Sequence, residues 1–90
     1  MKYTVTFTAF AEYQLADIWL RARNRQAVTQ AADYLDTLLR TDADQVGRLR
    51  SDGRRAVVKH PIGYTFEVSV ADCRVTVVSI RYFPPTQRPE

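Results

Sequence analysis

The sequence contains very little cysteine and histidine, and each shortage excludes a class of site. A single Cys73 excludes an internal disulfide and any site built from several cysteines. With His60 as the only histidine, a structural zinc site is excluded as well, and we expect no metal and no cofactor. Apolar runs are only a few residues long, so no membrane span is predicted. The first residues also lack the apolar core of a secretory signal, and we therefore expect a cytoplasmic protein.

The length and composition are those of one small globular domain. The chain has 90 residues, of which 46% are hydrophobic and 26% are charged. A chain of this size has room for a single hydrophobic core. We expect one domain over residues 1–83 and a proline-rich tail over residues 84–90.

Positive charge is concentrated in the second half of the chain. Residues 1–45 hold five Lys or Arg against six Asp or Glu, whereas residues 46–90 hold eight against four, so the halves carry −1 and +4. Guanidinium groups suit phosphate because they present a flat fork of donors that is always charged. The cluster favours a polyanionic target, although an acidic protein partner or a merely soluble surface would also account for it.

The first half of the sequence predicts one strand and two helices. Alternating side chains over residues 2–7 indicate a half-buried strand. Thr8 is suited to cap a helix, and Asn24 to cap a second one. The short gap between them predicts an antiparallel helical hairpin, whose close approach would be permitted by Ala31 and Ala32. The apolar stripes of the helices are formed by Ala11, Leu15, Ile18, Trp19 and Ala22, and by Val28, Ala31, Ala32, Leu35 and Leu39.

The second half predicts a loop over residues 41–53 and then three strands, over residues 54–60, 64–71 and 74–83. A two-residue turn at Asp72 and Cys73 would pair Thr65 with Ile80 and would direct Arg81 and Tyr82 to opposite faces. The order β-α-α-β-β-β predicts an α+β fold in which the helical hairpin covers one face of a mainly antiparallel sheet. We expect one buried cluster of Leu15, Ile18, Trp19, Val28, Leu35, Leu39, Phe66, Val68 and Val77.

This pattern resembles the RelE/ParE superfamily, over about residues 2–83. The resemblance rests on the strand at Tyr3–Phe7, the helical pair, Gly47, the entry to the sheet at Arg54-Arg55 and the final hairpin. It implies a single RelE-like domain and a role as the toxin of a bacterial type II toxin–antitoxin system. Such systems include ones that stabilise plasmids. A cognate antitoxin is implied as partner, with an acidic tail that would match the basic half of the chain.

Within the superfamily, the resemblance implies two kinds of target. RelE-type members are mRNA interferases that cut messenger RNA on the ribosome, whereas ParE-type members bind DNA gyrase without chemistry of their own. One scaffold serves both, so the fold alone does not decide between them. A degenerate member that only binds its antitoxin, or a general RNA-binding domain, is a further alternative.

The resemblance also directs attention to particular side chains. RelE-type ribonucleases carry an arginine where this chain has Thr65, and a group that transfers a proton near the position of Phe83. At both positions this chain departs from the pattern, because threonine cannot neutralise a phosphate and phenylalanine cannot transfer a proton. The candidate substitutes for catalysis are Arg55, Lys59, His60 and Tyr82. The candidate RNA- or target-binding residues are Arg48, Arg50, Arg54 and Arg81. Glu67 is either a base or the partner of Arg54 or Lys59 across the sheet.

Overall fold

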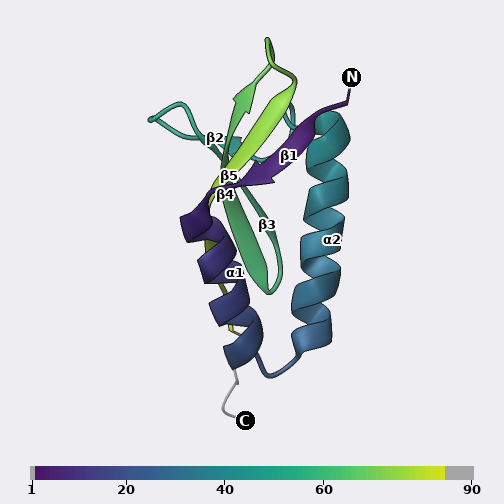
Figure 1. The fold of residues 1–90 in the computed structure, drawn as a ribbon, viewed down its shortest axis with the longest axis vertical. Helices are drawn as coiled ribbons and strands as arrows, with labels where there is room; N and C mark the ends of the chain where they lie inside the picture. The colour runs from purple at the N-terminus through teal and green to yellow at the C-terminus, as the bar shows by residue number, and fades with distance from the viewer. Residues whose placement is uncertain (1, 85–90) are drawn as a thin grey trace.

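The fold is α+β, with two helices on one face of a five-stranded sheet (Figure 1). The computed structural model describes residues 2–84. Its elements are β1 (Thr4–Phe7), α1 (Ala9–Arg21), α2 (Arg25–Asp42), β2 (Arg48–Leu49), β3 (Arg55–Lys59), β4 (Ile62–Ser69) and β5 (Arg74–Tyr82). The predicted class and order are confirmed, with the addition of the short strand β2 inside the predicted loop. The predicted tail lies, except for Pro84, outside the described residues.

The sheet has the order β1-β5-β4-β3-β2, so the first strand of the chain lies beside the last. β1 runs parallel to β5, and Thr4 to Phe7 pair with Arg74 to Val77. All other neighbours are antiparallel. α1 lies over β5, and α2 contacts β1, β3 and β4. No helix within residues 2–84 combines the length and apolar character needed to cross a bilayer.

Both helices begin at the predicted caps. The Thr8 hydroxyl accepts a hydrogen bond from the backbone N–H of Ala11 at 3.0 Å, and the Asn24 side chain accepts one from Ala27 at 3.0 Å. Each cap satisfies an N–H group that the first turn of a helix leaves without a partner. Local sequence chemistry therefore fixes where each helix starts.

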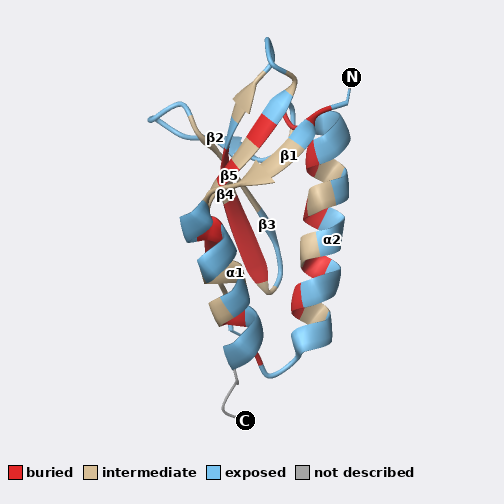
Figure 2. Ribbon diagram, in the orientation of Figure 1, coloured by how far each residue is buried: buried red, intermediate tan, exposed pale blue. Residues whose placement is uncertain are grey.

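The core lies between the helices and the sheet (Figure 2). Of the nine predicted core residues, Leu35, Leu39, Phe66 and Val77 are fully buried, and Ile18 and Val28 are nearly so. The prediction is wrong for Trp19, which is 41% exposed. Leu15 and Val68 are only partly buried against the cluster. α1 therefore uses a narrower stripe than the sequence predicts, centred on Ala11 and Ile18.

The predicted pairing of the last two strands is wrong, and the side chains near the end of β5 lie on the opposite faces of the sheet from those predicted. The turn spans residues 70–73 and not two residues, because Ser69 pairs with Arg74. A bulge then shifts the register, so that Thr65 pairs with Ser79 and Tyr64 pairs with Ile80. Directly opposed residues point to the same face of a sheet. Because Tyr64 and Ile80 are buried under the helices, Thr65 and Ser79 face away from them.

The free edge of β5 is covered by a side chain of α1. β1 ends at Phe7, beside Val77, so the later residues of β5 have no strand on that side. There the backbone N–H of Ile80 donates a 2.7 Å hydrogen bond to Oε1 of Gln14. A buried N–H without a partner is destabilising, so this contact joins α1 to the end of the sheet.

We expect Gln14→Met to lower the free energy of unfolding by about 1–3 kcal/mol, because it leaves the Ile80 N–H without its acceptor. Urea denaturation followed by circular dichroism measures this loss. Gln26→Met is the matched control, since Gln26 is exposed on α2, and it should leave stability unchanged. Equal stability of the two variants would show that the Gln14 contact contributes nothing.

Candidate functional site

A groove lies between the two helices, lined by residues 12–20 of α1 and residues 28–36 of α2. It has a volume of about 610 Å³. Close helix approach through Ala31 and Ala32 is therefore a wrong prediction: Ala32 lines the groove, and Ala31 is buried against the core. The groove is lined by Phe7 from β1, by Glu12, Leu15, Ala16, Trp19 and Leu20 from α1, and by Val28, Thr29, Ala32, Asp33 and Asp36 from α2.

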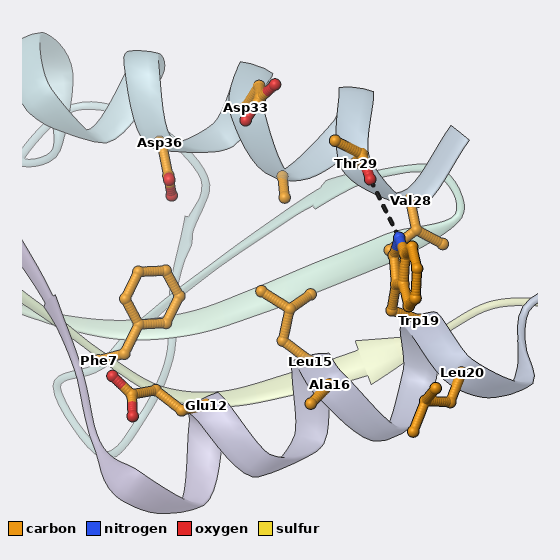
Figure 3. Close-up of a pocket in the computed structure, with 11 residues that line it drawn as sticks. Phe7, Glu12, Leu15, Ala16, Trp19, Leu20, Val28, Thr29, Asp33 and Asp36 are labelled. Carbon is orange, nitrogen blue, oxygen red and sulfur yellow. Dashed lines mark hydrogen bonds between the residues drawn. The ribbon is translucent and has the colours of Figure 1, made fainter. Parts of the chain in front are cut away.

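Trp19 closes the groove at the end where the helices connect (Figure 3). Its indole Nε1 donates to the Thr29 hydroxyl at 3.2 Å, which joins α1 to α2. The Arg25 guanidinium lies 4.8 Å above the indole ring and donates to the Trp19 and Leu20 carbonyls. The partial exposure of Trp19 thus follows from a bridging position between the helices.

Both walls of the groove combine apolar side chains with carboxylates. Figure 3 shows Leu15 and Trp19 from α1 and Asp36 from α2 pointing into the gap. Glu12 on α1 and Asp33 on α2 complete three acidic groups, and no Lys or Arg of residues 2–84 is among the lining side chains. A partly apolar groove with negative charge on both sides is suited to a partner that is apolar and basic.

Among residues 2–84, two buried side-chain oxygens have no hydrogen-bond partner, and one of them belongs to the groove residue Asp36. They are Oδ1 of Asp36 and the hydroxyl of Tyr64, a β4 residue that is 1% exposed. Burial raises the pKa of Asp36, an effect that nearby Arg40 opposes. Burial and then the charge of Asp36 raise the pKa of Tyr64 well above its usual range. The Tyr64 ring also meets the ring of Phe7 edge to face, with centroids 5.7 Å apart.

The opposite face of the sheet is open and mainly basic. Arg48 pairs with Ala56, which pairs with Thr65, so these three residues lie in one row on the open face. Arg81 lies opposite Gly63 on the same face and is exposed, which corrects its predicted separation from Thr65. Of the alternatives left open for Glu67, the structure shows the partner of Arg54, in a 3.1 Å ion pair. Arg50 is exposed in the β2–β3 connection.

The four candidate catalytic residues do not gather on the open face. Arg55 lies in the row of buried Phe66, and its Nε donates to the Val46 carbonyl at 2.9 Å. Lys59 extends over the ring of Tyr34 on α2, at 4.8 Å from its centroid. Both therefore lie on the helix side of the sheet.

The other two candidates meet in a small cleft at the end of the sheet. His60 and Tyr82 line it together with Phe83 and with Asn24 and Ala27 at the N-terminus of α2. The imidazole lies against the Phe83 ring, with centroids 5.6 Å apart. Tyr82 pairs with buried Ile62 and so belongs to the helix side, which corrects its predicted placement beside Thr65.

The acidic groove residues were not predicted as a site. Glu12 is explained by the helix N-terminus and Asp33 by the polar face of α2. Asp36 did carry a signal, because it lies four residues after Ala32 and three before Leu39, on the margin of the apolar stripe. Tyr64 carried none, since an alternating strand gives no sign that a hydroxyl lacks a partner.

The comparisons with known proteins identify the fold. No protein-family model matches the sequence, and no curated protein matches it. A chain of the RelBE2 toxin–antitoxin complex from Mycobacterium tuberculosis matches with a TM-score of 0.74 and 16% identity, covering 91% of this chain and 92% of that one. A chain of the chromosomal ParDE system from P. aeruginosa matches with a TM-score of 0.69 and 18% identity, covering 90% and 96%. The chain therefore shares its fold with these two chains, each of which comes from a toxin–antitoxin system.

We expect Asp36→Asn to stabilise the protein at neutral pH. Because burial raises the folded-state pKa of this carboxyl, the free energy of unfolding falls as pH rises from the ordinary value of 3.8 through the raised one. The variant removes that cost, so its melting temperature should exceed that of the wild type by a few degrees, and the difference should vanish in acid below 3.8.

Thermal denaturation at several pH values measures this difference. Asp42→Asn changes the same charge at an exposed position outside the groove and should not shift the melting temperature. A wild type more stable than Asp36→Asn at neutral pH would contradict the burial cost.

Proposed function

We propose that this chain is the toxin of a toxin–antitoxin pair and that its antitoxin docks in the groove between α1 and α2. The observation that carries the proposal is the groove itself. A small domain rarely leaves apolar side chains such as Leu20, 63% exposed, beside a partly exposed Trp19 unless a partner covers them. The likeness to chains of two toxin–antitoxin systems supports the same assignment.

The open face of the sheet is the proposed surface for the target. It presents Arg48, Arg54 and Arg81, with Glu67 the acidic group between them. These arginines, together with the hydroxyl groups of Thr65 and Ser79 on the same face, suit a phosphate backbone or an acidic protein surface. Because the groove and this face lie on opposite sides of the sheet, an antitoxin in the groove leaves room for a second segment to cover the target surface. A ribosomal or gyrase target would place the toxin's action in the cytoplasm.

Inhibition by binding, as for a ParE-like gyrase inhibitor, is the form of action that the site geometry favours. Arg55, Lys59 and Tyr82 lie on the helix side, and His60 lies in the turn beside Phe83. The open-face strand positions of residues 2–84 hold no histidine or tyrosine. General acid–base catalysis needs such groups within hydrogen-bond reach of one reacting centre.

Ribosome-dependent mRNA cleavage is the second candidate, and the arginines of the open face favour it. Ribonuclease chemistry needs a cation at the phosphate and a base at the ribose hydroxyl. Arg81 and Glu67 share this face, although the Glu67 carboxylate is held in an ion pair with Arg54. On the ribosome, the remaining groups would have to come from ribosomal RNA.

We expect induction of the chain in a bacterial host to arrest growth, and co-expression of the product of the adjacent reading frame to restore it. Leu20→Glu should stay toxic but should no longer be rescued, because it removes an apolar contact from the groove without reaching the core. Val70→Glu is the control, since Val70 is 52% exposed at the distant β4–β5 turn (Figure 1). Rescue of Leu20→Glu at the wild-type level would remove the groove from the proposal.

The two forms of action are separated by cell-free translation of a defined message, read by primer extension. We expect an intact message, and inhibition of gyrase supercoiling by the purified protein. Arg81→Ala should weaken that inhibition about tenfold, the loss of one well-placed guanidinium contact. Arg23→Ala, at an exposed position after α1, should have no effect. Message cleavage that requires translating ribosomes would establish the second candidate instead.

A further inference from the structure

We infer that two copies of this chain form a dimer in which their α1 helices pack antiparallel about a two-fold axis, through the side of α1 that faces away from the groove. The inference goes beyond the proposed function and does not rest on it. It is carried by a hollow between α1 and the end of β5, by two exposed aromatic side chains and by the order of charges along α1.

The hollow lies on the side of α1 opposite to the groove. It has a volume of about 530 Å³ and is lined by the end of β5 and, on α1, by Phe10, Tyr13, Gln14, Asp17, Ile18 and Arg21. These α1 residues follow the spacing i, i+3, i+4, i+7, i+8 and i+11, which is one face of a helix. None of them lines the groove, so a partner in the hollow leaves the groove accessible.

Two aromatic side chains of this face are open to solvent. Phe10 is 60% exposed and Tyr13 is 69% exposed, at neighbouring positions on the helix surface. Aromatic side chains remove a large apolar area from water when they are buried, and together with arginine they are enriched at the centres of protein interfaces. The hollow combines both aromatic residues with Arg21 and Arg81, which is the composition of a protein interface.

The occupant is not an added β-strand, because α1 already covers the free edge of β5. The Gln14 side chain accepts the hydrogen bond of the Ile80 N–H at 2.7 Å, and this N–H is a group that an added strand would need. The hollow instead presents a row of side chains along a helix. A second helix packs on such a ridge.

The order of residues along α1 makes this face complementary to itself. Phe10 and Tyr13 occupy its first half, and the Arg21–Asp17 ion pair, at 2.8 Å, occupies its second half. An antiparallel second copy exchanges the halves, so the aromatic residues of each copy meet the ion pair of the other. The Arg21 guanidinium can then lie over the Phe10 ring of the other copy, and the Tyr13 hydroxyl can donate to Asp17 of the other copy. A parallel copy would bring like charges together instead.

Other occupants fit this face less well. A nucleic acid needs free cations along its backbone, whereas Arg21 is already paired with Asp17 on this face. Arg81 is exposed on the open face of the sheet, so it borders the hollow and does not occupy its middle. A helix with an aromatic half and a charged half remains as the occupant, and α1 is such a helix.

The test is sedimentation equilibrium of the purified full-length protein over a range of concentrations. We expect a reversible monomer–dimer equilibrium with a dissociation constant on the order of micromolar, as is usual for a small interface. Tyr13→Glu should weaken the dimer at least about tenfold, because the new carboxylate faces Asp17 of the other copy. Tyr34→Glu makes the same change at a residue of α2 that is 52% exposed, and it should dimerise as the wild type does.

A second variant tests the antiparallel arrangement. Asp17→Arg alone should also weaken the dimer, because it removes the acceptor for Tyr13 of the other copy and adds a cation beside Arg21. In a mixture of Tyr13→Glu and Asp17→Arg, the new carboxylate at position 13 faces the new guanidinium at position 17. We therefore expect a mixed dimer that neither variant forms alone. Mixing does not repair a folding defect, so this rescue separates the interface from any loss of structure.

A monomer at every concentration would overturn the inference. A dimer that is weakened by Leu20→Glu and not by Tyr13→Glu would also overturn it, since that dimer would form through the groove. Loss of the dimer in both variants without rescue in the mixture would overturn the antiparallel arrangement. The result is separable from that of the proposed function, because sedimentation uses this chain alone and involves neither an antitoxin nor a cellular target.

Discussion

The structure depends on burial of one face of the central β4–β5 hairpin. Phe66, Val75 and Val77 are completely buried there, and Tyr64 is nearly so. Both helices must cover this face, because its apolar area is the main driving force for folding in so small a chain. The Tyr64 ring packs edge to face against the Phe7 ring within this core. Phe7 also lines the groove between α1 and α2, so this layer and the groove share one side chain.

Elements that depend on local chemistry were predictable from the sequence. The alternation of β1, the caps Thr8 and Asn24 and the stripe of α2 each follow from neighbouring residues alone. The register of β4 and β5 was not predictable, because it depends on a four-residue turn with Cys73 at φ 50° and on a bulge farther along. β2 was missed because its two residues carry no periodicity.

The same register error explains why the candidate sites changed. A shift of one residue exchanges the faces of a strand, so Arg81 joined the open face and Tyr82 left it. Residue types suited to catalysis can be found in a sequence, but their convergence on one face cannot. The groove was even less predictable from the sequence, since it arises from the spacing of two helices. Asp36 shows a hint of it in sequence, whereas the unpartnered Tyr64 hydroxyl appears only when the layers are assembled.

The parallel pairing of β1 with β5 has a consequence for the order of events during synthesis. Thr6 and its neighbour Thr76 are 70 residues apart in sequence, so β1 leaves the ribosome long before its partner strand. Until then the nascent chain holds α1 and α2 without the edge that positions Phe7, one of the groove residues. The wall that Phe7 contributes to the groove is therefore fixed in place only after β5 has been synthesised.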